Sequence, residues 1–569
     1  MAHGDDQRLL WIKGNPGKGK TMLLCGIIDE LEVSTPTSLL SFFFCQATDP
    51  RINSATAVLR GLIYILIKQQ PALISYVRQH YDPAGERGFE DPNTWVVLRE
   101  ILTNILKDPV VRIAYLFIDA LDECVTDLPQ LLKLIVEMSS TSFLVKWIVS
   151  SRNWTQIEEE LEMAAQNARL SLELNAKSVT AAVNAYIYHK VDDLSRRKKY
   201  DTATKSEVQN YLSSNANGTF LWVALVCKAL TDVPKWHTKG KLKTFPPGLD
   251  SLYRQMMGQI QNSEDADLCR DILAVAATVR RPISLDEITS LVRMPDGISD
   301  DRRSLEEIIS LCGSFLTIRK QTVYFIHQSA KDFLSGEVSN NNNYQDAFKW
   351  VFHAGKEKVN HDIFSKSLHV MFTALRRDIY GLKAPGISIN QVSMPNPDPL
   401  ASVRYSCIYW IDHLCDLISS TNSTWVHLLQ DNGDVQKFLT TKYLYWLEAL
   451  SLLGALSNGI NAVRQLQGLQ GSNNDGQLKV IIQDAHRFAQ SYGQIIQRAP
   501  LQVYLSALVF APIGSLFIVA SHVFKSSAES PKPGWLVTGS VVEMQWNACT
   551  QTLEGHRSSV GSVAFSPDG

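Results

Sequence analysis

The chain has 569 residues, of which 45% are hydrophobic and 20% are charged. This composition is typical of a globular protein with a substantial core, and it excludes disordered and collagen-like chains. The length predicts about three to five domains. Lys and Arg total 55 against 57 for Asp and Glu, which gives a net charge of −2. This near-neutral balance argues against a general binder of nucleic acids or anionic membranes.

Nine cysteines are scattered along the chain, and none of them forms a CxxC pair. The pattern is typical of reduced thiols in a cytosolic protein, so we expect neither a disulfide framework nor a zinc site. The N-terminal segment lacks the apolar stretch that a signal peptide needs. Together these features predict a cytoplasmic protein.

One apolar segment, Leu501–Ala520, is about as long as the roughly 20 residues that a membrane span requires. It contains Gln502, Pro512 and Gly514, which disfavour a transmembrane helix. We therefore prefer two buried strands that break at Ala511-Pro512, and we expect no association with a membrane.

A nucleotide-binding motif lies near the start of the chain. The apolar run Leu9–Lys13 predicts a strand, and Met22–Leu31 has helical spacing. The residues between them fit the pattern GxxxxGK[ST], which binds phosphates when it joins a strand to a helix. Its backbone N–H groups wrap the phosphates, its lysine reaches the β- and γ-phosphates, and its threonine is placed on Mg²⁺. The predicted nucleotide-binding residues here are Gly14, Asn15, Pro16, Gly17, Lys18, Gly19, Lys20, Thr21 and Met22, with Thr21 also a predicted metal ligand.

A second predicted strand ends in a cluster of carboxylates. Ala114–Ile118 is fully apolar, as in a buried parallel strand, and it is followed by Asp119, Asp122 and Glu123. Parallel sheets place ligand chemistry at the carboxyl ends of their strands. We predict that Asp119 organises the Mg²⁺ ion. Asp122 and Glu123 are the candidate catalytic residues that orient or activate the attacking water.

Two more strands are predicted at Leu39–Cys45 and Lys146–Ser150, which are rich in β-forming residues. A cation at the tip of a strand beside the carboxylates can sense the γ-phosphate. Arg152 is the predicted sensor, with a plain surface arginine as the alternative. Arg51, just past the first of these strands, is a weaker candidate for the same role.

The chain resembles the NACHT family of signal-transduction NTPases in the order of four segments. These segments are WIKGNPGKGKT, FFFCQATDPRINSATAVLRGLIYIL, AYLFIDALDEC and WIVSSR. The likeness is greatest to the fungal heterokaryon-incompatibility proteins, which join a NACHT domain to WD repeats, and it is strongest over residues 8–335. The family often has Gly after the first Asp of its acidic motif, where this chain has Ala120. The resemblance implies a P-loop core with a parallel sheet over residues 1–175.

Residues 176–250 are predicted to form a helical lid. Asn217-Gly218-Thr219 breaks the helical pattern and starts the buried helix Phe220–Leu230. The basic run Arg196–Lys199 is interpreted as a solvated helix end and not as a nucleic-acid patch. Pro246-Pro247 lies at a lid joint, and in NACHT relatives a proline at such a point contacts the nucleotide base.

Residues 251–345 predict a winged helix, with three helices and a hairpin formed by Phe315–Ile318 and Val323–Ile326. Ser284 to Glu287 is a capping box that opens the second helix. That helix has acidic residues and no Lys or Arg before Arg293, so we do not expect DNA binding.

His327 follows the second wing strand. An isolated histidine near a core is usually a satisfied side chain. The family resemblance instead implies a nucleotide-binding role, in which this histidine binds the β-phosphate of the diphosphate and locks a closed state.

The remainder predicts a helical arm over residues 346–500 and the start of a WD-repeat β-propeller over residues 501–569. The signs of the propeller are Gly555-His556, the alternating strand Val560–Phe565 and the turn Ser566–Gly569. The chain stops inside this unit, so we expect it to be truncated at both ends, without an N-terminal effector domain or a complete propeller.

The fold class is therefore expected to be multidomain, α/β plus α. The predicted function is a switch in intracellular signalling, non-self recognition or programmed cell death. It would be closed with a nucleoside diphosphate and would self-associate when bound to ATP or GTP with Mg²⁺, as a slow NTPase. Protein ligands would bind the propeller, and the effector is unknown. A mechanical ATPase and a nucleotide-binding scaffold of weak activity are the alternatives.

Overall fold

The computed structural model describes residues 8–84, 94–141, 144–163, 167–172, 175–295, 297, 301–336, 345–419, 423–469, 476–512, 514–515 and 546. These residues form two compact units. The first contains the residues up to Ser263 together with Ile326–Phe333, and the second contains Glu264–Phe325 and the described residues from Leu334 on. The predicted start of the winged-helix domain at residue 251 thus falls inside the first unit. The C-terminal signs of a WD repeat lie outside the described residues.

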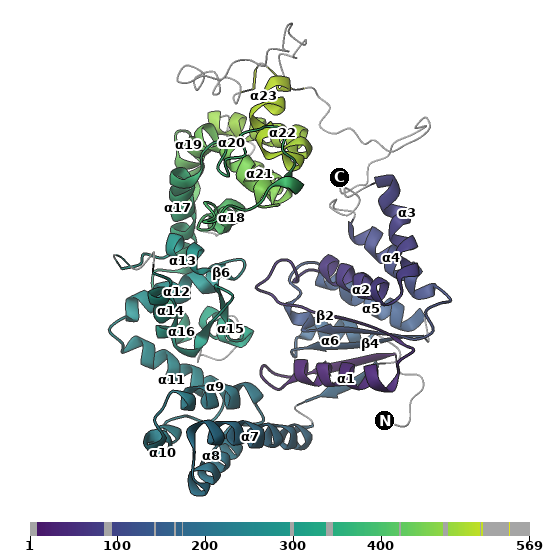
Figure 1. Ribbon diagram of the computed structural model, residues 1–569, viewed down its shortest axis with the longest axis vertical. Helices are drawn as coiled ribbons and strands as arrows, with labels where there is room; N and C mark the ends of the chain where they lie inside the picture. The colour runs from purple at the N-terminus through teal and green to yellow at the C-terminus, as the bar shows by residue number, and fades with distance from the viewer. Residues whose placement is uncertain are drawn as a thin grey trace. The chain divides into compact units, whose positions relative to one another are not determined.

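A five-stranded parallel sheet with the strand order β2-β3-β4-β1-β5 is the centre of the first unit. This confirms the predicted parallel sheet of a P-loop core. The central strands β3 and β4 are buried along nearly their whole length, as expected for a parallel sheet that is covered on both faces. Helices α2, α4 and α5 share one core with the sheet, and α1 packs against β3 and β4 (Figure 1). The strands are β1 (Leu9–Lys13), β2 (Leu39–Phe44), β3 (Ala114–Asp119), β4 (Val145–Ser151) and β5 (Asn167–Ser171). The helices are α1 (Lys20–Ser34), α2 (Ala55–Gln69), α3 (Ile74–Ala84), α4 (Thr94–Lys107), α5 (Leu128–Thr141) and α6 (Thr155–Glu162).

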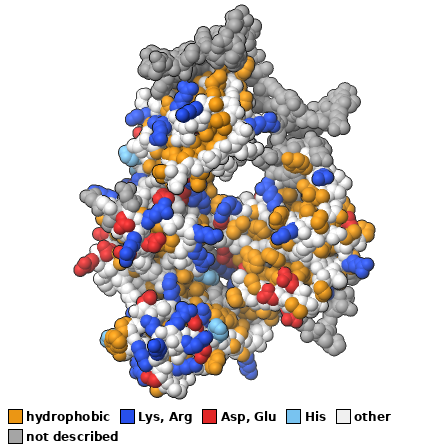
Figure 2. Space-filling view, in the orientation of Figure 1, with side chains coloured by type: hydrophobic (Ala, Val, Ile, Leu, Met, Phe, Trp, Pro, Cys, Tyr) orange, Lys and Arg blue, Asp and Glu red, His pale blue; other side chains and the backbone are white. Residues whose placement is uncertain are grey.

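The lid of the first unit is helical, as predicted. Its helix α9 begins at Phe220, immediately after the Asn217-Gly218-Thr219 break, and its inward side chains are fully buried. The basic run closes α7, where Arg196 and Arg197 pair with aspartates one turn earlier. Figure 2 shows Lys and Arg side chains gathered over this helical part of the molecule. The helices are α7 (Ala176–Lys198), α8 (Thr202–Asn215), α9 (Phe220–Thr231), α10 (Thr238–Leu242) and α11 (Leu249–Gln261).

The second unit starts with the winged helix, whose small antiparallel sheet has the order β6-β8-β7. The predicted capping box is present: Ser284 accepts from the Glu287 N–H, and the Glu287 carboxylate accepts from the Ser284 N–H. Its elements are α12 (Ala266–Thr278), β6 (Ile283–Ser284), α13 (Leu285–Leu291), α14 (Arg302–Leu311), β7 (Leu316–Arg319) and β8 (Thr322–Phe325). Helix α15 (Gln328–Ser335) follows, and its residues up to Phe333 belong to the first unit.

A helical arm makes up the rest of the second unit, around a core that contains Trp410, Phe438 and Trp446. Its helices are α16 (Gln345–Val351), α17 (Lys356–Ala374), α18 (Arg404–Ser419), α19 (Asp434–Thr441), α20 (Tyr443–Leu452), α21 (Leu456–Gly468), α22 (Gln477–Arg498) and α23 (Ser506–Phe510). Across the described residues, no helix is long and apolar enough to cross a bilayer.

The prediction of two strands in Leu501–Ala520 is wrong over its first half. Residues Pro500–Tyr504 form a 3₁₀ helix and Ser506–Phe510 form α23. Val503 and Ala507 are buried in the same core as the arm helices. A short apolar run does not distinguish a strand from a buried helix by its periodicity, and here packing against α20 and α22 favours the helix.

Candidate nucleotide site

The loop between β1 and α1 has the backbone of a phosphate cradle. Gly17 and Gly19 adopt φ angles of 75° and 87°, in the left-handed region that favours glycine. The Lys20 ammonium folds back over the loop and donates to the carbonyl oxygens of Gly14 at 2.6 Å and Asn15 at 3.3 Å. The predicted lysine therefore lies across the mouth of the predicted loop.

The N-terminus of α1 fits an anion. Within the described residues, no side chain caps this helix, and its first turn contains no acidic residue. The first N–H groups of a helix have no partner within the helix, and they carry a partial positive charge. A phosphate bound to the loop would satisfy these donors, which is the chemistry that the sequence motif predicts.

The Walker A threonine and the predicted Mg²⁺-organising aspartate are in direct contact. The Thr21 hydroxyl donates to Asp119 Oδ2 at 2.6 Å, and the other oxygen of Asp119 accepts from Ser150. Asp119 ends β3 and is 4% exposed. A hydroxyl and a carboxylate at this separation are suited to share an Mg²⁺ ion, either directly or through its water ligands. The predicted metal ligands Thr21 and Asp119 are thus brought together.

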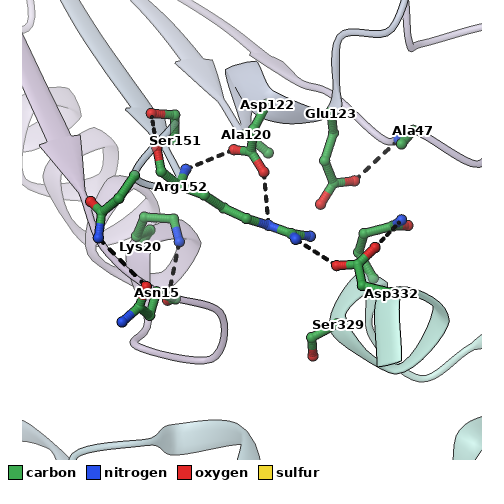
Figure 3. A network of polar contacts seen from close by, with 12 residues as sticks. Asn15, Lys20, Ala47, Ala120, Asp122, Glu123, Ser151, Arg152, Ser329 and Asp332 are labelled. Atoms are coloured by element: carbon green, nitrogen blue, oxygen red, sulfur yellow. Dashed lines mark hydrogen bonds and ion pairs between the residues drawn. The ribbon is translucent and has the colours of Figure 1, made fainter. Parts of the chain in front are cut away.

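Glu123 has the properties of a general base near neutral pH. Burial, and secondarily the charge of Asp122, raise the pKa of Glu123 to about 7, although a hydrogen bond from the Ala47 N–H favours the ionised form. A base of this pKa is half ionised at physiological pH, where proton transfer from water is efficient. Figure 3 shows its carboxylate beside the Ala47 amide.

Asp122 pairs with Arg152, the predicted sensor. One of its oxygens accepts from the Arg152 N–H at 2.9 Å, and the other lies 2.9 Å from Arg152 Nε. Asp122 therefore holds the predicted sensor arginine, and its role toward water stays a prediction. Arg152 is 9% exposed, so it is not the plain surface arginine of the alternative. Arg51 is 83% exposed at its side chain and pairs locally with Asp49.

His327 is neutral and has a defined tautomer. Its Nδ1 accepts from the Ser329 N–H at 3.1 Å, which leaves the proton on Nε2 as a donor. Burial lowers the pKa of His327 to about 4, and the positive charges of Arg152 and Lys20 contribute to this shift. The charged surroundings of His327 thus include Lys20 of the P-loop and Arg152.

The lid contacts the outer side of the P-loop. The Lys18 ammonium donates to the Asn217 carbonyl at 2.7 Å, and the Phe220 N–H donates to the Gly17 carbonyl at 2.9 Å. Pro246, a predicted base contact, accepts a hydrogen bond from the Trp222 indole. The segment between α8 and α9 therefore holds the loop through two hydrogen bonds.

We expect Gly19→Ala to weaken nucleotide binding at least tenfold, which corresponds to about 1.4 kcal/mol. An alanine is strained at a φ of 87°, and its Cβ would lie 2.8 Å from the Phe220 ring. Gly258→Ala is the matched control, because Gly258 is helical and a Cβ there meets nothing within 4 Å. Equal affinities of the two variants by calorimetry would show that the loop tolerates the side chain.

Sequence reasoning missed several contacts of the site. Ser150 could have been found, because it is a polar residue at the end of a strand beside Asp119. The Tyr253 hydroxyl lies 3.0 Å from the Ser329 hydroxyl, and Asp332 accepts from the Arg152 guanidinium. Neither residue has a local sequence signal, and Asp332 is 180 residues from Arg152. The remaining predicted loop residues lie as follows: Pro16 is partly buried, Asn15 accepts from the Asn153 amide, and Met22 is 68% exposed on α1.

A parallel sheet, a glycine-bent loop before α1 and a threonine–aspartate contact define a P-loop nucleotide-binding fold. Residues 1–152 match the family described as "Nephrocystin 3, N-terminal". The chain is 65% identical over 571 residues to the vegetative incompatibility protein HET-E-1 of Podospora anserina, in an alignment that includes 100% of this chain. The chain is therefore a homologue of this vegetative incompatibility protein, which confirms the resemblance to fungal incompatibility proteins.

The chain spans 42% of the length of this relative. One solved structure, the Walker-type ATPase PABY2304 of Pyrococcus abyssi, aligns with a TM-score of 0.27 and 11% identity. That alignment covers 57% of this chain and 89% of that chain. Its similarity is too low to inform on function.

Proposed function

We propose that this chain is the nucleotide-dependent switch of a cytoplasmic protein of fungal non-self recognition or programmed cell death. It binds ATP or GTP with Mg²⁺, hydrolyses it slowly, and retains the diphosphate in a closed state. Its 65% identity to a vegetative incompatibility protein supports the biological setting. Self-association in the triphosphate state and an effector outside this chain complete the proposal.

The observation that carries the proposal is the position of His327. A P-loop enzyme needs Lys20, Thr21, Asp119 and a base such as Glu123. It does not need a histidine that follows the wing hairpin. His327 nevertheless belongs to the same unit as the P-loop, and the charges of Lys20 and Arg152 influence its pKa. Its Nε2–H is a donor suited to a phosphate oxygen, which would favour the closed state when diphosphate is bound.

The residues of the site have separate roles in binding and hydrolysing the nucleotide. The P-loop amides and Lys20 bind the phosphates, and Thr21 and Asp119 would hold Mg²⁺, which supplies charge neutralisation at the phosphates. Glu123 accepts a proton from the attacking water, for which its pKa of about 7 is suited. Arg152 faces the added charge of a γ-phosphate.

Single-turnover kinetics separates the switch from a mechanical ATPase. A switch hydrolyses one triphosphate and keeps the diphosphate for many times the duration of the chemical step, whereas a mechanical enzyme releases it in each cycle. Purified protein should therefore contain bound diphosphate, to be detected by denaturation and chromatography. Rapid multiple turnover without retained product would favour the mechanical ATPase, and binding without hydrolysis would favour a scaffold.

We expect His327→Ala to release the diphosphate about ten- to a hundredfold faster. The variant lacks a charge-assisted hydrogen bond, which contributes about 1.5–3 kcal/mol. Stopped-flow displacement with a fluorescent diphosphate measures the rate, and limited proteolysis near Lys239–Pro247 measures opening of the lid. His189→Ala, on the exposed face of α7, is the control. Identical rates and cleavage patterns in His327→Ala and wild type would identify His327 as an ordinary buried histidine.

A further inference from the structure

The predicted sensor arginine is already bound to carboxylates. Arg152 lies between Asp122, whose Oδ2 is 2.9 Å from Nε, and Asp332, whose Oδ2 is 2.5 Å from NH1 (Figure 3). The side chains of these three residues are 11%, 3% and 9% exposed. Water therefore screens these ion pairs poorly, and they are stronger than pairs at the surface.

The two carboxylates come from different parts of the chain. Asp122 lies just beyond β3, and its second contact with the Arg152 N–H fixes it to the end of β4. Asp332 lies on α15, and its other oxygen accepts from the Gln328 amide at 3.0 Å. Asp122 is thus part of the sheet edge, while Asp332 belongs to the segment Ile326–Phe333 that follows the wing hairpin.

Further contacts join this segment to the rest of the first unit. Besides the Arg152 pair, the Tyr253 hydroxyl and the Ser329 hydroxyl lie 3.0 Å apart, and the Tyr253 and Phe333 rings pack at 5.4 Å between centroids. Residues immediately before and after the segment belong to the second unit. The Arg152–Asp332 ion pair adds a charged contact to these polar and aromatic ones.

A carboxylate and a terminal phosphate compete for the same donors. Both are anions that accept N–H bonds from a guanidinium in its plane. A γ-phosphate that takes the NH1 hydrogen now donated to Asp332 must displace the Asp332 oxygen. A diphosphate does not displace Asp332, because it lacks the γ-phosphate that Arg152 would bind.

We propose that Asp332 sets the preference of this site for diphosphate over triphosphate, by occupying the Arg152 guanidinium that a γ-phosphate would otherwise bind. This inference rests on the proposed function and assigns a specificity-determining role to a residue of α15. Displacement from Arg152 deprives the buried Asp332 carboxylate of its ion pair with the guanidinium, which is costly. Triphosphate binding thereby favours departure of the Ile326–Phe333 segment, and diphosphate binding favours its retention.

The test compares the affinities of ADP and of the β,γ-imido analogue of ATP, each with Mg²⁺, by calorimetry on the full chain. The same comparison with GDP and the β,γ-imido analogue of GTP forms the second arm of the test. Asp332→Asn should improve the affinity for the triphosphate analogue relative to the diphosphate by about ten- to a hundredfold, the range for one charge-assisted hydrogen bond. Asp332→Glu retains the charge and should retain most of the wild-type preference. It also serves as the test variant if the asparagine variant does not fold.

A double-mutant cycle shows whether Asp332 changes the affinity ratio through its contact with Arg152. If Asp332 acts through Arg152, Asp332→Asn should leave the affinity ratio unchanged in an Arg152→Ala background. A change of the same size in that background would mean that Asp332 repels the phosphate directly, and it would overturn the inference. Equal weakening of both ligands by Asp332→Asn would also overturn it, because that is the result of a purely structural role.

Glu287→Gln is the matched control. It removes a buried carboxylate that pairs with Arg281 at 2.6 Å inside the winged helix. The variant therefore measures the effect of losing a buried ion pair outside the nucleotide site. Its affinity ratio should equal that of wild type. If wild type binds neither the adenine nor the guanine nucleotides, the proposed function itself fails. If wild type binds nucleotide but Asp332→Asn leaves the ratio of triphosphate to diphosphate affinity unchanged, only the inference about Asp332 fails.

Discussion

Lys20→Ala should abolish measurable binding of both di- and triphosphates, with a loss of affinity of at least a hundredfold. The variant loses a positive charge that lies across the P-loop, where the ammonium donates to the Gly14 and Asn15 carbonyls. Two charge-assisted contacts to phosphate at about 1.5–3 kcal/mol each account for a loss of this size. Isothermal titration calorimetry with ADP and ATP in the presence of Mg²⁺ is the measurement.

Lys133→Ala provides the control for the change in charge. Lys133 is exposed on α5, outside the predicted site, so its variant should bind as wild type does. The helical circular dichroism signal of both variants should match wild type, which separates loss of binding from loss of fold. Unchanged affinity in Lys20→Ala would refute the assignment of the P-loop.

Glu123→Gln should keep nucleotide bound and slow single-turnover hydrolysis by about a hundred- to ten-thousandfold, the usual contribution of a general base. The amide cannot accept a proton from water, but it can still accept the Ala47 N–H. Because the pKa of Glu123 is about 7, kcat/KM of the wild type should rise between about pH 6 and pH 8 as the carboxylate ionises. This rise should be absent in the variant.

Two comparisons make this result specific. Glu137→Gln, on the exposed side of α5 where Glu137 pairs with Arg99, should hydrolyse at the wild-type rate. Asp119→Asn should instead weaken the dependence on Mg²⁺, because Asp119 contacts the Thr21 hydroxyl. If both Glu123→Gln and Asp119→Asn hydrolyse nucleotide at the wild-type rate, the two carboxylates have a structural role only.

The parts of the site that could be predicted are those in which residue type and local order suffice. A glycine-rich loop between a strand and a helix implies its own backbone geometry, as the positive φ angles of Gly17 and Gly19 show. Acidic residues after a buried strand must appear at the same sheet edge as the loop. For this reason the Thr21–Asp119 contact followed from the sequence without an alignment.

The parts that could not be predicted depend on long-range packing. Nothing local distinguishes Asp332 from other aspartates on helices, and its partner is 180 residues away. Asp122 and Glu123 are both candidates for orienting or activating the attacking water by sequence, but the Asp122 carboxylate contacts Arg152 and the Glu123 carboxylate contacts the Ala47 amide. The apolar run after residue 500 was mistaken for strands because its burial depends on α20 and α22, which the run itself does not reveal.

The contact between the lid and the P-loop has a thermodynamic consequence. The Gly17 carbonyl accepts from the Phe220 N–H and the Lys18 ammonium donates to the Asn217 carbonyl, so the segment before α9 restrains the loop at two points. Ordering a free loop costs about 1–2 kcal/mol of backbone entropy per residue, and a loop that is already ordered avoids most of this cost on binding. Nucleotide binding should therefore show a small entropic penalty, and shortening the Asn217–Thr219 turn should increase that penalty while leaving every phosphate contact of the loop in place.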